Sequence, residues 1–245
     1  MNRLRYIMEP QSLLLTWQPV DESSPTRTRR VVASVRRSQA NSREWEFEYL
    51  IGTEDWDAAV EAGFKGHPAF KWTGAHTIFR SGVRDTLIRR LPPLNREDFP
   101  EFLALHRLPE PFHYSEMALL GYTGAKLPSD GFSLAPQFSQ SSQPCEYVLE
   151  VAGARHVFAG DLMDIRIGDP VELRLEPLNP VDEDAIALYH HEVKLGYVNR
   201  AMRSTFLNWL EHGQLEGAIE RLNGKPERPL IYVRIAANCS LAVPY

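Results

Sequence analysis

A stretch of nine residues without a charged side chain divides this chain into two parts with different sequence patterns. Residues 136–144 read PQFSQSSQP and are mostly Ser, Gln and Pro. Such a composition buries too little apolar surface to order itself and is typical of a linker. We therefore expect an N-terminal module over residues 1–135, a linker over 136–144 and a C-terminal domain over 145–245.

The N-terminal part begins with strand patterns and continues with helix patterns. The predicted strands are 12–17, 29–35 and 45–51. Their spacing favours an antiparallel meander. The predicted helices are 53–63, 81–90 and 95–107. Thr53 is the expected N-cap of the first of these helices, and Gly63 lies at its end. The module is therefore expected to mix strands and helices.

The C-terminal part is a series of short strand patterns interrupted by one helix pattern. The predicted strands are 146–151, 170–176, 185–190, 194–198, 218–222 and 230–235. Strands of this length and spacing favour a small barrel. Met202, Phe206 and Trp209 share one face of the predicted helix. Asn199 is expected to cap its start and Gly213 its end. The fold class expected for the whole chain is α+β.

The net charge limits how this chain can bind nucleic acid. It is −5, from 27 Lys and Arg against 32 Asp and Glu, which argues against a protein that coats DNA by charge alone. Residues 1–144 hold 17 basic and 17 acidic side chains, whereas residues 145–245 hold 10 and 15. Nucleic-acid binding by the C-terminal part would therefore depend on a few local contacts.

The densest basic segment, residues 26–43, contains no acidic side chain. Its arginines are Arg27, Arg29, Arg30, Arg36, Arg37 and Arg43. The segment can contact phosphates. It can also be a hairpin with arginines on its solvent face, which is a common way of protecting a sheet edge. The hairpin is the favoured interpretation.

The sequence lacks the usual motifs of catalysis and metal binding. No phosphate-binding loop, dinucleotide fingerprint, zinc-protease helix or hydrolase elbow occurs. Cys145 and Cys239 have neither C-x-x-C spacing nor a neighbouring His cluster, so both are expected to be buried thiols. We therefore expect that the protein is not an enzyme and that it binds neither a cofactor nor a metal. With no apolar run suited to a membrane span or signal peptide, a cytoplasmic location is expected.

Two polar groups in the C-terminal part leave alternatives open. His190 and His191 end a predicted strand and point to opposite faces, so a core and surface pair is favoured over a shared metal. Asp182, Glu183 and Asp184 can offer oxygen ligands to a divalent cation. They can equally make the turn between two strands, which is the favoured interpretation.

Residues 176–200, EPLNPVDEDAIALYHHEVKLGYVNR, resemble the HIRAN domain. The signature of that family is a strand, N-P-x-D-x-x-A-I, a second strand, and a G-Y/H-V/I motif that ends in Arg or Lys at a helix start. Upstream, ARHVFAG at 154–160 is similar to the aromatic opening segment of the family. The resemblance covers roughly 145–240 and implies an OB-like barrel. HIRAN domains occur in DNA-remodelling helicases, where they grip single-stranded DNA at a free 3′ end, and also as stand-alone bacterial proteins.

The resemblance implies a set of nucleic-acid-binding residues in this chain. They are Arg155, His156, Phe158, Asn179, Asp182, Tyr197 and Arg200. By the family pattern, Asp182 accepts a hydrogen bond from a terminal ribose hydroxyl, and the amide of Asn179 fixes the loop. Tyr197 and Arg200 flank a predicted helix start, where a phosphate and a stacked base are favoured.

Two positions depart from the family pattern. Val181 stands where a Tyr is common before the Asp, and Val157 replaces one of the paired aromatics. Each lost stacking face is worth about 1–3 kcal/mol in single-strand binding. End recognition is therefore expected to be weaker or redirected.

The N-terminal part bears a fainter resemblance, spread over residues 12–136, to the small N-terminal subdomain of HipA-type toxin kinases. The matching segments are LLLTWQP, FEYL, the stretch around LIRRLPPLNREDF, and MALLGYTGAKLPSDGFSLAP. No catalytic Asp loop can be placed, so the resemblance implies a docking or regulatory module.

Two functions follow from these observations. The first is a non-enzymatic protein that binds single-stranded DNA or a DNA 3′ end through the barrel and docks a partner through its N-terminal module. The second is an antitoxin-type regulator of a separate HipA-like kinase, with the barrel serving protein interaction.

Overall fold

The computed structural model describes residues 3–21, 28–38, 41, 44–127, 129–139, 143–225, 228–239 and 241. Within these ranges, no helix is long and apolar enough to cross a membrane. The chain forms two compact units, which are described separately here. The N-terminal unit comprises Glu9–Phe102 and His113–Ser139. The barrel unit comprises Met1–Met8, Leu103–Phe112 and Gln140–Tyr245.

The two units do not follow the order of the chain. Residues 1–8 and 103–112 belong with the barrel unit, although both lie within the predicted N-terminal module. The predicted linker at 136–144 begins inside strand β5 (Phe132–Gln137). Pro136 and Gln137 are paired there with Leu13 and Ser12 of strand β1 (Ser12–Trp17), and residues 140–142 lie outside the described part.

An antiparallel sheet in the order β4-β3-β2-β1-β5 forms the N-terminal unit. Its other strands are β2 (Arg30–Arg37), β3 (Trp45–Tyr49) and β4 (Ile78–Phe79). Its helices are α1 (Glu54–Glu61), α2 (Val83–Ile88) and α4 (Glu116–Thr123), while α3 (Phe99–Leu105) leads into the barrel unit. The predicted meander is confirmed, since β2 pairs with both β1 and β3. Thr53 caps α1 by accepting a hydrogen bond from the Trp56 N–H.

The described arginines of the basic segment have partners within the N-terminal unit. Arg30 pairs with Asp55 at 3.4 Å, and Arg37 pairs with Glu9 at 3.5 Å. Arg36 bonds Glu46 and lies 3.0 Å from Glu48 on the neighbouring strand. Arg29 donates to the hydroxyls of Ser133 and Thr16. These contacts support the hairpin interpretation, while Arg27 and Arg43 lie outside the described residues.

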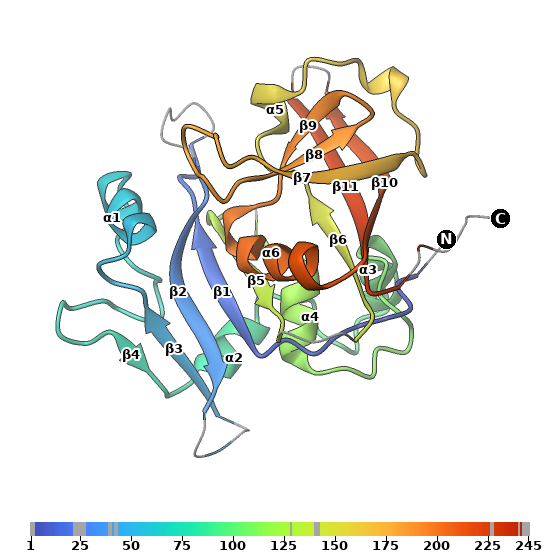
Figure 1. The fold of residues 1–245 in the computed structure, drawn as a ribbon. Helices are drawn as coiled ribbons and strands as arrows, with labels where there is room; N and C mark the ends of the chain where they lie inside the picture. Colours follow the sequence, from blue (N-terminus) through green and yellow to red (C-terminus); the bar gives the residue numbers. More distant parts are fainter. Residues whose placement is uncertain are drawn as a thin grey trace. The chain divides into compact units, whose positions relative to one another are not determined.

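The barrel unit is a curled antiparallel sheet in the order β6-β11-β10-β7-β8-β9 (Figure 1). Its strands are β6 (Cys145–Glu150), β7 (Pro170–Leu175), β8 (Ile186–His190), β9 (Val193–Tyr197), β10 (Leu215–Lys225) and β11 (Arg228–Ala237). Its helices are α5 (Ala154–Val157) and α6 (Arg203–His212), with short 3₁₀ turns at Leu162–Asp164 and Arg200–Met202. Phe206, Trp209 and Met202 are buried in the core, as the predicted helix face requires. The expected α+β fold with a C-terminal barrel-like sheet is confirmed.

The two edge strands of this sheet meet at one point. The N–H of Ala152 donates to the Tyr197 carbonyl at 2.8 Å, and the Tyr197 N–H donates to the Ala152 carbonyl at 2.8 Å. Gly196 makes this approach possible, because a Cβ on it would lie 2.4 Å from the Ala152 carbonyl oxygen. Its φ of +145° is also one that other residues rarely adopt. The glycine of the LGYV motif is therefore needed to close the sheet.

Distant segments of the chain join the barrel unit around one buried ion pair. Arg234 of β11 donates to Glu146 of β6 at 2.7 Å and to the Arg3 carbonyl at 3.1 Å. Glu146 also accepts from the backbone N–H of Arg5, and its own N–H donates to the Tyr6 carbonyl. With residues 1–8 and 103–112 included, the unit holds 13 Lys and Arg and 16 Asp and Glu, a net charge of −3. Its charge deficit is thus smaller than that of residues 145–245 alone.

Candidate nucleic-acid interface

The carboxylate of Glu176 anchors the loop that joins β7 to β8. It accepts hydrogen bonds from the Tyr189 hydroxyl at 2.9 Å, the Asn179 amide at 3.1 Å and the Tyr197 hydroxyl at 3.2 Å. It also pairs with Lys194 of β9. Burial alone raises the pKa of Glu176, but the hydrogen bonds from Lys194, Tyr189 and Asn179 outweigh it and lower this pKa to about 2. The start of the loop is thus tied to both following strands.

Asn179 shapes the tip of the same loop. Its side-chain oxygen accepts from the backbone N–H groups of Val181 at 3.0 Å and Asp182 at 3.2 Å. Its amide nitrogen donates to Glu176 and, at 3.2 Å, to the Tyr197 hydroxyl. An Asn that bonds its own backbone in this way holds a turn in one conformation. The structure therefore brings together two of the predicted site residues, Asn179 and Tyr197.

Two arginines surround the carboxylate of Asp182 at the end of the loop. One guanidinium nitrogen of Arg203 donates to both carboxylate oxygens, at 2.5 and 2.6 Å. Arg200 lies 3.7 Å from the same carboxylate. Asp182 also accepts from the Asp184 N–H at 3.1 Å, so the acidic segment forms the expected turn. Asp182, Arg200 and Arg203 are partly exposed, with 17%, 23% and 34% of their side-chain surfaces accessible.

Arg203 is a residue that the predicted site omitted. It follows Arg200 by three positions across the start of α6, where both side chains can reach one carboxylate. The spacing R-x-x-R after the G-Y-V motif was the available signal in the sequence. Asn199 caps the turn that orients these arginines, accepting from the Met202 N–H at 3.2 Å.

The remaining predicted site residues lie on or after α5. Arg155 and His156 are exposed on this short helix, and the Arg155 side chain donates to His156 at 2.8 Å. Phe158 follows the helix and is half-buried. Its ring lies against Gly160, where a Cβ would be 2.9 Å from the ring. Helix α5 packs against β9 and β11, so these residues stand beside the strand that carries Tyr197.

Two apolar side chains protrude from the loop between β7 and β8, where this sequence departs from the family pattern. Val181 is 79% exposed and Leu178 is 95% exposed, on either side of Asn179. Single exposed apolar residues are common on protein surfaces. These two, however, are held on a loop fixed at both ends by hydrogen bonds. Val181 thus occupies an accessible position, without the ring that the pattern would place there.

Other polar candidates in the barrel unit have structural partners. His190 is buried, its ring nitrogen lying 3.1 Å from the Pro170 carbonyl oxygen, and His191 is exposed, as predicted. The two rings do not point to opposite faces, however, since their centroids are 4.3 Å apart, and the φ of +50° at His191 ends the strand alternation. Cys145 is buried, but Cys239 is only half-buried, so the prediction of two buried thiols is wrong for Cys239. The end of β11 leaves its side chain partly open to solvent. Among the described residues, no group of three or more His, Cys, Asp or Glu is placed to hold a metal.

The low pKa of Glu176 predicts a pH dependence of stability. Because its folded pKa of about 2 lies below its usual value of 4.5, the unfolded chain binds the proton more readily. The resulting stabilisation is complete above the usual pKa and is lost as the pH falls toward 2. We expect Glu176→Gln to reduce the change in unfolding free energy between pH 5 and pH 2, measured by urea titration. Glu183→Gln, at an exposed position of the same loop, should leave that change as it is. If both variants show the same change in unfolding free energy between pH 5 and pH 2, Glu176 is not the source of the pH dependence.

Comparison with known proteins gives one family and two solved structures. A family model described as "HIRAN domain" matches residues 146–243. The crystal structure of the HIRAN domain of human HLTF is 21% identical, with 38% of this chain and 74% of that chain covered and a TM-score of 0.30. A crystal structure of a protein from Lactobacillus plantarum is 23% identical, with 38% and 97% covered and a TM-score of 0.33. No curated protein matches the chain. The HipA-like resemblance of the N-terminal part finds no support here and stays a prediction.

Proposed function

Residues 146–243 of this chain form a HIRAN domain, and we propose that this domain binds single-stranded DNA or a DNA 3′ end through the loop between β7 and β8. One observation carries the proposal. The signature segment folds into a single polar cluster, in which Asn179 and Tyr197 fix the loop and Asp182 is held beside Arg200 and Arg203. The proposed role is binding and includes no catalytic step.

The Asp182 carboxylate has the chemistry to receive a terminal hydroxyl. A hydroxyl both donates and accepts, so it can bond the carboxylate and an adjacent guanidinium together. A terminal phosphate would instead meet Asp182, Glu183 and Asp184, three neighbouring carboxylates. We therefore expect the loop to prefer a 3′-hydroxyl end over a 3′-phosphate end.

Charge supports a small binding surface. The barrel unit carries a net charge of −3, so an extended track along many phosphates is disfavoured. In the N-terminal unit, the described arginines of β2 pair with carboxylates, and Arg29 donates to two hydroxyls. We therefore place the nucleic-acid contact in the barrel unit alone.

Fluorescence anisotropy with a labelled single strand tests the proposal. We expect saturable binding at low salt, tighter for a 3′-hydroxyl than for a 3′-phosphate end. Asp182→Asn should weaken binding of the hydroxyl end about tenfold or more, because a hydrogen bond to a charged acceptor is worth about 1.5–3 kcal/mol. Glu183→Gln, at the neighbouring exposed carboxylate, is the matched control and should bind the hydroxyl end as the wild type does. The absence of saturable binding, or equal binding by the Asp182→Asn variant, would overturn the proposal.

A further inference from the structure

The hydrogen-bonding capacity of the Asn179 side chain is fully used within the barrel unit. A carboxamide offers two N–H donors and two acceptor lone pairs on its oxygen. The two donors go to Glu176 at 3.1 Å and to the Tyr197 hydroxyl at 3.2 Å. The oxygen accepts from the backbone N–H groups of Val181 and Asp182. The Asn179 side chain therefore has no hydrogen-bonding position left for a nucleic acid.

The Tyr197 hydroxyl is saturated in the same way. A hydroxyl has one donor and two acceptor lone pairs. This one donates to Glu176 at 3.2 Å and accepts from Asn179 at 3.2 Å and from the Lys194 ammonium at 3.3 Å. The ammonium also lies 5.1 Å from the centre of the Tyr197 ring, within the range of a cation–π contact. The hydroxyl thus serves the internal structure of the site.

Lys194 can reach this hydroxyl because β9 contains a bulge. Residues three apart on a regular strand point to opposite faces of the sheet. Here β9 has one residue more than β8 between two successive cross-strand pairs, which are Leu188 with Gly196 and Tyr189 with Lys194. A bulge of this kind changes the direction in which a side chain points. It brings the Lys194 and Tyr197 side chains to the same side of the sheet.

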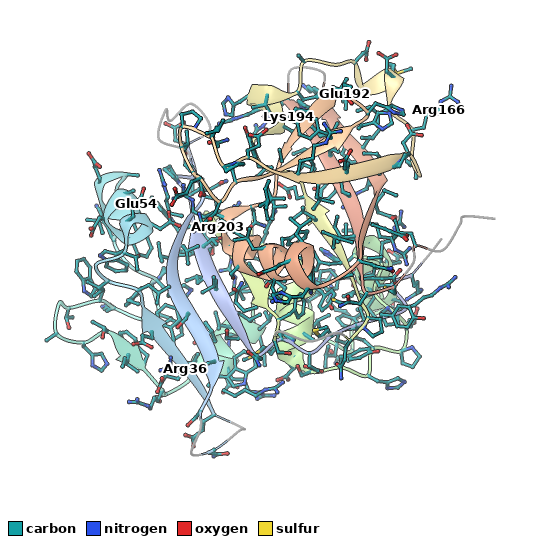
Figure 2. All side chains as sticks on the ribbon, in the orientation of Figure 1. Arg36, Glu54, Arg166, Glu192, Lys194 and Arg203 are labelled. Carbon is teal, nitrogen blue, oxygen red and sulfur yellow. The ribbon has the colours of Figure 1, made fainter. Side chains whose placement is uncertain are left out.

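Lys194 connects the start of the loop to two aromatic rings. Its ammonium pairs with Glu176 and lies 5.6 Å from the centre of the Tyr189 ring. The Tyr189 hydroxyl donates to the same carboxylate at 2.9 Å. The hydrogen bond to Glu176 raises the pKa of Lys194, so this side chain stays charged. Figure 2 shows Lys194 on β9 and Arg203 well apart from it, at the start of α6.

From these contacts we propose that Lys194 is a positioning residue for recognition of the DNA end. Together with Glu176 and Tyr189, it holds the Tyr197 hydroxyl in place. That hydroxyl in turn fixes Asn179, which holds the backbone N–H groups leading to Asp182. This inference rests on the proposed function and adds how the binding loop keeps its shape. Lys194 acts without touching the nucleic acid, which meets Asp182 and its neighbouring arginines.

The Lys194→Met variant tests this role by separating affinity from charge. In fluorescence anisotropy, we expect it to bind a 3′-hydroxyl single strand about tenfold more weakly, as for the loss of one hydrogen bond to a charged group. Its preference for a 3′-hydroxyl over a 3′-phosphate end should fall as well. The slope of log K against log salt concentration should stay at the wild-type value. A lysine that bound a phosphate directly would contribute about 0.7 to that slope.

Arg174→Met is the matched control for loss of a cation at the same aromatic ring. Arg174 lies 4.6 Å from the centre of the Tyr189 ring, but its carboxylate partners are Glu172 and Glu192, outside the loop. This variant should bind as the wild type does. Hydrogen exchange of the loop between β7 and β8 should become faster in Lys194→Met and stay unchanged in Arg174→Met.

Tyr197→Phe is a second variant, which keeps the ring and removes only the hydroxyl. It should weaken hydroxyl-end binding as Lys194→Met does, because both changes remove the bond between Lys194 and this hydroxyl. Wild-type binding by either variant, or a slope shallower by about 0.7 in Lys194→Met, would overturn the inference. If the effect of Asp182→Asn is retained in that case, the proposed function stands. If the wild type binds neither kind of end, both proposals fall.

Discussion

Replacing Gly196 by Ala is expected to lower the free energy of unfolding of the barrel unit by at least about 3 kcal/mol, combining overpacking with backbone strain. The new Cβ would lie 2.4 Å from the Ala152 carbonyl oxygen and 3.2 Å from the Ala154 backbone nitrogen. Both are backbone atoms, so a change of side-chain rotamer cannot relieve the overlap. The structure has to open where Ala152 and Tyr197 pair, and the proposed DNA binding should be lost with it.

Gly153→Ala is the control for this substitution. Gly153 also has a positive φ, +71°, but a Cβ there would meet only Tyr197, at an ordinary distance of 3.7 Å. Its expected cost is the left-handed strain alone, about 1–2 kcal/mol. Urea unfolding of both variants, followed by hydrogen exchange of the peptides around residues 152 and 197, measures the difference. Equal losses of stability would show that backbone conformation, rather than close approach, makes Gly196 necessary.

The second large effect is expected at the buried pair of Glu146 and Arg234. Arg234→Met should cost about 3–5 kcal/mol, because it leaves a buried charge without its main counter-charge. The side chains of Glu146 and Arg234 are 1% and 5% exposed, so water cannot replace the lost partner. The Arg3 carbonyl also loses a donor. We expect residues 3–8 to detach from the sheet before the rest of the unit unfolds.

A double substitution separates the ion pair from the packing around it. With Glu146→Gln and Arg234→Met together, no buried charge remains, and the loss should be clearly smaller than the sum of the two single losses. Hydrogen exchange at residues 3–8 and 145–150 gives the local readout in the full chain. If the double variant loses as much stability as the two single variants together, the two side chains do not act as a pair.

Much of the fold could be predicted from local sequence patterns. The alternating strand at 45–51 and the cap at Thr53 are found as β3 and the start of α1. Helix α4 was missed, because its residues are almost all buried and show no amphipathic period. The glycines and prolines that follow it also interrupt the apolar pattern. The helix predicted at 95–107 is shorter, with α3 at Phe99–Leu105.

The residues of the candidate site could largely be predicted from the sequence. The hydrogen bonds and ion pairs between their side chains could not. The resemblance put Asn179 and Tyr197 in one set of binding residues, and in the structure their side chains are in contact. The four-donor environment of Glu176 depends on the register of β8 and β9, including a bulge between Leu188 and Tyr189. No spacing in the sequence reveals that register. The pairing of Arg203 with Asp182 depends equally on how α6 starts after Asn199.

The position of Arg3 beside Arg234 also affects how this protein can be made and rearranged. These two residues are 231 positions apart, yet one hydrogen bond joins them. Pairings so distant in sequence cannot form until almost the whole chain has been synthesised, which makes this part of the barrel unit slow to complete. A gene segment that encodes only residues 146–243 would omit residues 3–8 and 103–112, which belong to the barrel unit. A segment limited to residues 146–243 would therefore lack the backbone partners that Arg3 and Arg5 give to Arg234 and Glu146 in the full chain.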